Sequence, residues 1–256
     1  MNILLCGYNG YMGREVRALA EKKGSGFEVV CGIDIVKDEG EVPCAGGFDE
    51  EFSDKFRNAL GKTDCIIDFS HHSLTPALMG FAATEKLPVV LCTTGQTQEE
   101  METVRKAAES IPVFSSANMS LGIALLVRMA KKTAAFMPGA EIEIIEKHHD
   151  RKLDAPSGTA LMIANEIGEV RPGTVLNPGR KGQGKRQPNE IGISSVRIGN
   201  VIGEHEVIIS TGTETVTLKH EAHSRALFAE GAVAAAEYLV GKGPGIYDMK
   251  SMMGEE

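Results

Sequence analysis

The chain has 256 residues, 42% hydrophobic and 24% charged, which is typical of a soluble globular protein, and its formal net charge is −8 at pH 7. This acidic balance argues against a nucleic-acid-binding protein, because neutralising phosphates requires a basic surface. No apolar run approaches the ~20 residues that span a bilayer, and no basic signal region precedes the first apolar run. We therefore expect a cytoplasmic protein without a membrane partner, in which the five cysteines are buried free thiols.

The first half of the chain alternates short apolar runs with segments of helical spacing. The runs are rich in Val, Ile and Leu, as in parallel strands covered on both faces, and they lie at 2–7, 27–34, 64–70, 87–95 and 111–118. Helical periodicity lies between them at 12–24 and 98–110. This order predicts βαβ units, and hence an α/β fold with a Rossmann-like, doubly wound parallel sheet.

The sequence LLCGYNGYMGRE places Gly7, Gly10 and Gly13 where the first strand should turn into the first helix. Glycines there let backbone N–H groups approach a pyrophosphate, although an ordinary turn also uses glycine. Asp34 ends the second run, where an acid would accept hydrogen bonds from the adenosine ribose. Together these features predict a dinucleotide site. Asp34 favours NADH, whereas the nearby Lys37 would tolerate the 2′-phosphate of NADPH, so NADH and NADPH both stay open.

Two further loops follow the fourth and fifth apolar runs. They contain Cys92-Thr93-Thr94-Gly95 and Ser116-Ala117-Asn118-Met119. In an open parallel sheet, ligands bind at the carboxyl ends of the strands. We expect both loops to line the nicotinamide end of the cofactor, the alternative being two ordinary turns between strand and helix.

The hydrophobic period changes after a helical segment at 121–137, which Pro138 and Gly139 close. Residues 140–148 alternate strictly and predict a half-solvated strand, and 158–170 predict a helix. A Gly- and Pro-rich stretch at 171–192 suggests a mobile loop, lid or linker. Three further strand-like runs suggest an antiparallel meander, and an Ala-rich helix follows at 225–243. The second part is therefore expected to be an α+β domain with a mixed or antiparallel open sheet.

The stretch EKHHDRKLDAPSGTAL, residues 146–161, concentrates proton carriers before a helix start. Asp154 reads as a capping acid, and the N–H groups of Gly158 and Thr159 would receive a carboxylate. His148 and His149 point to opposite sides of an extended segment, so one of them faces a given ligand atom. The spacing matches no metal motif, and no metal site is expected. A proton-donating, anion-binding site is favoured over a solvated loop.

This stretch resembles the motif of the 4-hydroxy-tetrahydrodipicolinate reductase family, whose members act in bacterial lysine and diaminopimelate biosynthesis. The resemblance spans nearly the whole chain and includes Gly7–Met12, Asp68-Phe69-Ser70, Thr93-Thr94-Gly95, Ala117-Asn118 and the late segments 199–207 and 217–232. It implies a dinucleotide-binding domain made of 1–119 and 226–256, and a substrate-binding and oligomerisation domain at 120–225. It also implies a homotetramer, and NADH- or NADPH-dependent reduction of (2S,4S)-4-hydroxy-2,3,4,5-tetrahydrodipicolinate to tetrahydrodipicolinate with loss of water.

Site roles follow from the same resemblance. His148 becomes the general acid/base and Lys152 its partner proton donor. The small dicarboxylate substrate would be held by His149, Ser157, Gly158, Thr159, Thr94 and Arg225. The cofactor would contact Gly7, Tyr8, Asn9, Gly10, Tyr11, Met12, Asp34, Cys92, Thr93, Thr94, Ser116, Ala117, Asn118 and Met119.

Some positions depart from the family pattern: Cys92 where glycine is common, Met119 where an aromatic is common, and the pair His71-His72. These changes concern the cofactor pocket more than the reaction. We interpret His220 as structural. The rival hypotheses are a two-domain dehydrogenase of another small acid, such as an amino acid, and a nicotinamide-binding sensor without turnover.

Overall fold

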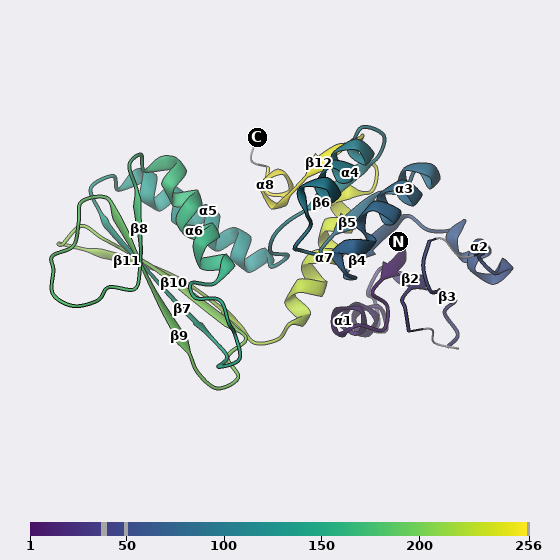
Figure 1. The fold of residues 1–256 in the computed structure, drawn as a ribbon, viewed down its shortest axis with the longest axis horizontal. Coiled ribbons are helices and arrows are strands. Elements are labelled where there is room, and N and C mark those ends of the chain that lie inside the picture. The colour runs from purple at the N-terminus through teal and green to yellow at the C-terminus, as the bar shows by residue number, and fades with distance from the viewer. Residues whose placement is uncertain (37–39, 49–50, 255–256) are drawn as a thin grey trace. The chain divides into compact units, whose positions relative to one another are not determined.

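The computed structural model describes residues 1–36, 40–48 and 51–254 (Figure 1). The chain divides into two units, which are described separately: unit 1 comprises Met1–Ser120 and Ala226–Glu256, and unit 2 comprises Leu121–Arg225. Among the described residues, none of the helices has both the length and the apolar character needed to cross a bilayer.

Unit 1 is built on a parallel sheet that has seven strands among the described residues, in the order β12-β6-β5-β4-β1-β2-β3. The strands are β1 (Asn2–Cys6), β2 (Glu28–Ile33), β3 (Cys44–Ala45), β4 (Cys65–Asp68), β5 (Val89–Leu91), β6 (Pro112–Ser115) and β12 (Gly245–Tyr247). The five predicted strands are confirmed. Apart from Val29 and Val30 of β2, which are partly buried, their Val, Ile and Leu side chains are buried on both faces of the sheet, which explains the lack of polar alternation.

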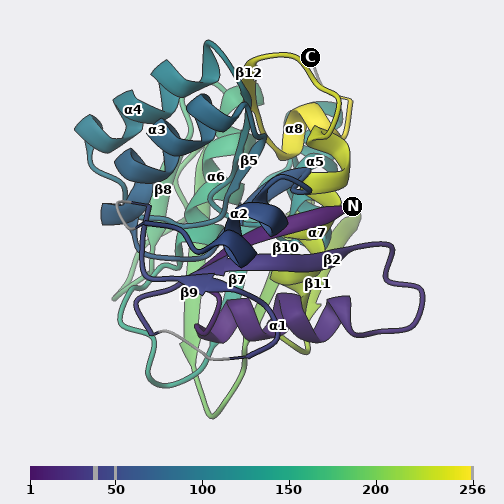
Figure 2. The same ribbon diagram turned by 90° about the vertical axis from the view of Figure 1, so that its right-hand side faces the viewer.

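Helices cover both faces of this sheet. They are α1 (Tyr11–Ala20), α2 (Asp54–Leu60), α3 (Thr75–Glu85), α4 (Gln98–Ala108), α7 (Ala226–Leu239) and α8 (Met249–Met252), with a 3₁₀ turn at His72–Leu74. Helices α3 and α4 pack together on one face, and α1 and α7 pack together on the other (Figures 1 and 2). Leu4 and Cys6 point to the α3–α4 side within one apolar cluster. The doubly wound fold class is confirmed.

Unit 2 packs two helices, α5 (Leu121–Phe136) and α6 (Gly158–Val170), on one face of a five-stranded sheet, all of whose residues are described. The strand order is β11-β10-β7-β9-β8, with β7 (Glu141–His148), β8 (Val175–Pro178), β9 (Glu190–Arg197), β10 (Gly203–Ser210) and β11 (Thr215–Ala222). Strand β7 alternates as predicted, since its buried side chains come from Ile142, Ile144, Glu146 and His148. The sheet is mixed, because β9 runs parallel to β7 and β8 while β10 runs antiparallel to β7 and β11.

Three expectations for unit 2 are wrong in part. The antiparallel meander is limited to β10 and β11, because β7 lies between β9 and β10. The first half of β9, Glu190–Ile193, is continuously buried, which suits a strand between two parallel neighbours. The loop expected at 171–192 contains the edge strand β8. The cap of α6 is Ser157 rather than Asp154.

Candidate functional site

The turn between β1 and α1 requires glycine at two positions. Gly7 has φ +76° and donates its N–H to the Ile33 carbonyl at 2.9 Å. A Cβ on Gly7 would collide with the Phe69 carbonyl oxygen, and one on Gly13 would collide with the Gly7 carbonyl oxygen. The turn therefore packs backbone directly against backbone. Because no side chains lie at these positions, a ligand can approach the amides at the start of α1 closely.

The N-terminus of α1 fits a dinucleotide diphosphate. Its N-cap is Gly10, which places no side chain over the first amides, and the first turn contains no acidic residue. Uncapped amides and the helix dipole favour an anion there. Tyr11 is exposed beside them, whereas the Tyr8 side chain is buried against Gly32 with the Arg17 guanidinium 4.2 Å above its ring. Tyr8 therefore offers a ligand its backbone rather than its ring.

Asp34 follows β2 and organises the same turn. One carboxylate oxygen accepts the Asn9 N–H at 2.8 Å, and the other accepts the Val36 N–H at 2.9 Å. The Asn9 side chain in turn donates to the Val36 carbonyl at 2.7 Å. Asp34 is thus fixed beside the glycine turn, with remaining lone pairs that suit a ribose hydroxyl. Lys37 lies outside the described residues.

The ends of β4 and β5 are tied together through Asp68, which is fully buried. Ser70 donates its hydroxyl to Asp68 at 2.5 Å, and the Cys92 N–H donates to the Asp68 carbonyl at 3.0 Å. Burial raises the pKa of Asp68, and hydrogen bonds from Ser70 offset only part of that rise. The loop holding Thr93 and Thr94 is therefore anchored to the neighbouring strand, and Thr94 itself is exposed.

The loop after β6 closes on itself. Ser116 donates its hydroxyl to the Asn118 carbonyl at 2.9 Å, and the Asn118 side chain accepts the Ser120 N–H at 2.8 Å. Ala117 is exposed, whereas Met119 is buried with its carbonyl against Gly231 of α7. The two loops predicted for the nicotinamide thus leave the carboxyl ends of adjacent parallel strands.

The pair His71-His72, which departs from the family pattern, has partners within unit 1. Nδ1 of His71 lies 2.9 Å from the Ser73 hydroxyl, and Nδ1 of His72 lies 3.0 Å from both carboxylate oxygens of Glu100. Glu100 also accepts the N–H of Thr97 as part of the capping box of α4. These contacts give both histidines a local structural role.

In unit 2, His148 ends strand β7 and is nearly buried. Its Nδ1 lies 2.5 Å from a carboxylate oxygen of Glu146, which is fully buried two residues earlier on the same face. Arg197 of the neighbouring strand β9 donates to both oxygens of Glu146, at 2.9 and 2.8 Å. Burial raises the pKa of Glu146, but hydrogen bonds from His148 and Arg197 outweigh it and hold the pKa far below the usual range.

The start of α6 joins this cluster through Ser157. Its N–H donates to Glu146 at 3.1 Å, and its hydroxyl accepts the Ala160 N–H as the helix cap. The same hydroxyl lies 3.2 Å from Nε2 of His205, a buried residue of β10. Burial lowers the pKa of His205 to about 4, with the neighbouring His148 acting in the same direction. The buried Ser157 hydroxyl is thus committed within the protein, while Gly158 and Thr159 form the first turn of α6.

Positive charge surrounds His149. Burial lowers its pKa, and Arg151, Arg225 and Lys152 each lower it further. The Lys152 ammonium lies 2.8 Å from the Asp154 carboxylate, and this ion pair holds the ammonium in the segment just before α6. A region where cations oppose the protonation of a histidine attracts a dianion, so this electrostatic setting suits a dicarboxylate.

Three members of the cluster lie outside the set of site residues predicted from the sequence, and they are Glu146, Arg197 and His205. The strict alternation of 140–148 could have revealed Glu146, because it places a carboxylate on the buried face together with His148. Arg197 and His205 reach the site only through the pairing of β7 with β9 and β10, for which the sequence holds no local signal.

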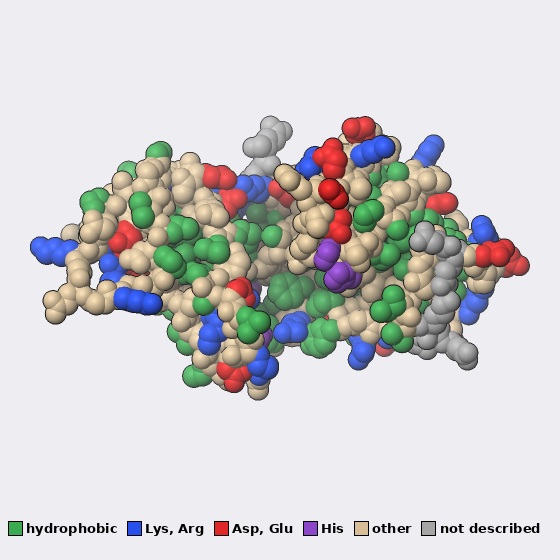
Figure 3. All heavy atoms as spheres, viewed as in Figure 1, with side chains coloured by type: hydrophobic (Ala, Val, Ile, Leu, Met, Phe, Trp, Pro, Cys, Tyr) green, Lys and Arg blue, Asp and Glu red, His purple; other side chains and the backbone are tan. Residues whose placement is uncertain are grey.

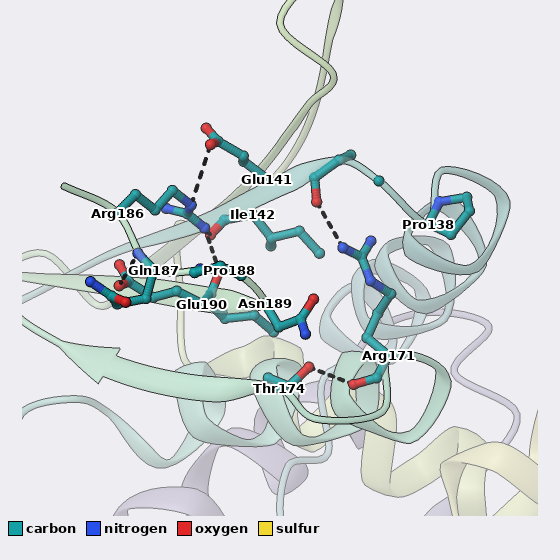
Figure 4. A pocket seen from close by; sticks show the side chains of 13 residues that line it. Pro138, Glu141, Ile142, Arg171, Thr174, Arg186, Gln187, Pro188, Asn189 and Glu190 are labelled. Atoms are coloured by element: carbon teal, nitrogen blue, oxygen red, sulfur yellow. Dashed lines mark hydrogen bonds and ion pairs between the residues drawn. The ribbon is translucent and has the colours of Figure 1, made fainter.

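A cavity of about 360 Å³ lies at the opposite end of β7 (Figure 4). Arg171 donates there to the Met137 and Ala140 carbonyls, and Arg186 donates to Ile142. The adjoining loop 179–189 contributes exposed Lys and Arg side chains (Figure 3). The two arginines that line this cavity therefore already donate to acceptors of the protein itself.

Comparisons with known proteins agree along the chain. Family models described as dihydrodipicolinate reductase, N-terminus and C-terminus, match residues 1–119 and 122–253. The 4-hydroxy-tetrahydrodipicolinate reductase of Caldanaerobacter subterraneus subsp. tengcongensis is 43% identical over 256 residues, covering 99% of this chain and 98% of that protein. The enzyme of the same name from Clostridium novyi is 41% identical, covering 98% and 97%.

Solved structures extend the comparison. The dipicolinate-bound dihydrodipicolinate reductase from Paenisporosarcina sp. TG-14 has a TM-score of 0.76 and 25% identity, covering 97% of both chains. A DAP dehydrogenase of C. glutamicum has a TM-score of 0.57 at 15% identity, covering 97% of this chain and 92% of that one, and shares the fold alone. The amino-acid dehydrogenase alternative is therefore not favoured. The sequence matches in both halves show that the chain belongs to the dihydrodipicolinate reductase family.

Proposed function

We propose that the chain acts as a 4-hydroxy-tetrahydrodipicolinate reductase, an NAD(P)H-dependent oxidoreductase of lysine and diaminopimelate biosynthesis. It reduces (2S,4S)-4-hydroxy-2,3,4,5-tetrahydrodipicolinate to tetrahydrodipicolinate with loss of water. The main support is the match to relatives of that name over nearly the full chain. The cluster around His148, with a proton carrier beside a positively charged helix start, suits this dicarboxylate.

His148 is the proposed general acid, with Lys152 as the second proton donor. Loss of the 4-hydroxyl together with a proton from C3, as water, leaves a carbon–carbon double bond conjugated with the ring imine. The reduced nicotinamide, when bound, would supply the hydride that adds at C4 of that ring. A proton must then reach a neighbouring carbon, and His148 is supported as its source because Glu146 orients the ring through Nδ1. Lys152 stands on the same short segment and contributes charge beside the helix start.

The substrate carboxylates are proposed to bind at the start of α6. Gly158 and Thr159 form the first turn of α6, at the positive end of the helix dipole. His149 would add a hydrogen-bond donor and Arg225 a positive charge. Arg225 is one of the charges that lower the pKa of His149, which supports placing the two side chains at one site. Ser157 contributes by capping the helix and holding Glu146.

Unit 1 is proposed to bind the cofactor through residues 7–12, Asp34, and the loops 92–95 and 116–119, with Thr94 beside the nicotinamide and the substrate. The uncapped start of α1 suits the diphosphate. Asp34 would accept from the ribose and repel a 2′-phosphate, which favours NADH.

We also propose a homotetramer, as in the family, formed through unit 2. Both helices of the unit cover one face of its sheet, and the other face exposes Val196 among polar side chains. Light scattering on the purified protein should then give four times the mass of one chain. The mass of a monomer at micromolar concentration would contradict this assembly.

The function is tested by following NADH, and separately NADPH, by absorbance on adding the fresh product of dihydrodipicolinate synthase. We expect rapid oxidation that depends on this substrate, and the two rates give the coenzyme preference. Folded protein that binds either coenzyme but oxidises neither would contradict the proposed reaction.

A further inference from the structure

The carboxylate of Glu146 is fully buried and contacts Nδ1 of His148. We propose that Glu146 is a positioning residue that holds His148 with a proton on Nδ1 and presents Nε2 as the nitrogen that exchanges a proton with the substrate. The inference rests on the proposed function, in which His148 is the general acid.

The register of the sheet builds this arrangement. Glu146 and His148 alternate onto one face of β7, and His148 lies opposite Arg197 of the parallel strand β9. At 2.5 Å, the contact between Nδ1 and Glu146 is a charge-assisted hydrogen bond. An ionised carboxylate can only accept, so Nδ1 must be the protonated nitrogen.

Arg197 keeps the carboxylate ionised without making the site strongly negative. Its guanidinium donates to both oxygens of Glu146, and the Ser157 N–H donates a further hydrogen bond. The buried pair is therefore neutral as a whole. Glu146 fixes the orientation and the tautomer of the imidazole, while Arg197 balances the charge of the carboxylate.

The other edge of the ring is kept clear. A Cβ on Gly203 would come within 3.3 Å of Nε2 of His148, so glycine leaves room beside that nitrogen. The His205 ring packs edge-on against His148, with 5.2 Å between centroids, and burial holds its pKa at about 4. A neutral His205 does not compete for the proton.

Any pH dependence of His148 reflects all the charged groups around it. These groups come from β7, β9, β10, β11 and the loop before α6, and they are Glu146, Arg197, His205, His220, His149 and Lys152. Among the described residues, Glu146 is the hydrogen-bond partner of a His148 ring nitrogen. A variant of Glu146 alone therefore isolates the proposed effect.

The first test uses NMR of the free protein and needs no substrate. The imidazole ¹⁵N shifts of His148 should identify the Nδ1–H form, and its pKa should fall by about one unit or more in Glu146→Gln, because an opposite charge at contact distance is removed. Glu206→Gln on β10 is the matched control, since it removes a carboxylate from the opposite face. An Nε2–H form in the wild type, or an unchanged pKa in Glu146→Gln, would overturn the proposal.

The second test is kinetic. Glu146→Gln should lower kcat by roughly 10- to 100-fold with little change in KM for the coenzyme, and should shift the His148 limb of the kcat–pH profile. If the lone Arg197 charge prevents folding, Glu146→Gln/Arg197→Met removes both charges and should shift the profile in the same direction but by less, because a neighbouring positive charge is removed as well. Normal kcat with an unshifted profile contradicts the positioning role. Failure of the wild type to oxidise either coenzyme contradicts the proposed function instead, and the NMR result still decides the tautomer.

Discussion

His148 and His149 are adjacent in sequence but differ in surroundings, which allows one to serve as the control for the other. We expect His148→Gln to lower turnover by roughly 10²–10⁴-fold with coenzyme binding unchanged, because glutamine cannot donate a proton as imidazolium does. His149→Gln should instead raise KM for the substrate, since His149 belongs to the positively charged helix start. Steady-state rates and coenzyme titration by fluorescence measure both. Near-normal turnover in His148→Gln would remove it as the proton donor.

Asp34 has two tasks that a substitution can separate. Asp34→Ala removes the acceptor expected for the ribose and the charge that repels a 2′-phosphate, so the Kd for NADH should rise more than the Kd for NADPH. It also removes the hydrogen bonds to Asn9 and Val36, which weakens both coenzymes to some extent. Titrations with the two coenzymes check this. Equal losses would mean that Asp34 supports the turn without contacting the ribose.

At the scale of single residues, the sequence predicted best what lies in one short segment. The stretch 146–161 holds His148, Lys152 and the start of α6 together, so local spacing and family likeness were sufficient to propose a site there. Glu146 belongs to the same stretch, but its role depends on Arg197. The two residues are 51 positions apart and become neighbours only when β7 and β9 pair. Long-range strand register decides such contacts, and no window of sequence contains it.

Among the elements, the turn from β1 into α1 offers a matched pair of glycine substitutions. Gly7→Ala should destabilise unit 1 by roughly 1–3 kcal/mol and weaken coenzyme binding, because Gly7 has φ +76° and its Cβ would meet the Phe69 carbonyl. Gly80→Ala, on the exposed side of α3 with no atom within 4 Å of the new Cβ, should stabilise by about 0.5–1 kcal/mol. Denaturant unfolding and coenzyme titration measure the two effects. Equal stability of the two variants would contradict a tight turn.

Prediction of elements succeeded where the hydrophobic period was long and failed where elements were short or paired at a distance. The two-residue β3 and three-residue β12 are too short to show a period. Strand β8 pairs at the sheet edge through a segment rich in Gly and Pro, so composition concealed it. The position of β9 beside β7 could not be predicted because consecutive strands more often pair with each other.

For the whole molecule, acid should destabilise the fold through the buried His205. Its pKa is about 4 in the folded state against about 6.5 in the unfolded chain, so the unfolded chain takes up a proton first as pH falls. The contribution of His205 to the free energy of unfolding is therefore fully present above pH 6.5. It declines by about 3 kcal/mol toward pH 4. The pKa values of His149 and His220 are also lowered and add to the decline.

Urea unfolding between pH 7 and pH 4 measures this decline. His205→Gln is the control, because glutamine can still accept from Ser157 but does not titrate. The variant should lose less stability than the wild type over this range. An identical pH dependence would show that His205 is not responsible.

Helix α7, the edge strand β12 and helix α8 of unit 1 come from the end of the chain. This affects the order in which the two units can fold during synthesis. Residues 121–225 are synthesised, and can fold, before α7 exists to pack against α1, β4, β5 and β6. A released chain that is truncated at Arg225 should therefore hold a protease-resistant unit 2 beside a protease-sensitive N-terminal segment. Release of the complete chain should make that segment resistant, so the two ends of the polypeptide mature together although they are translated furthest apart.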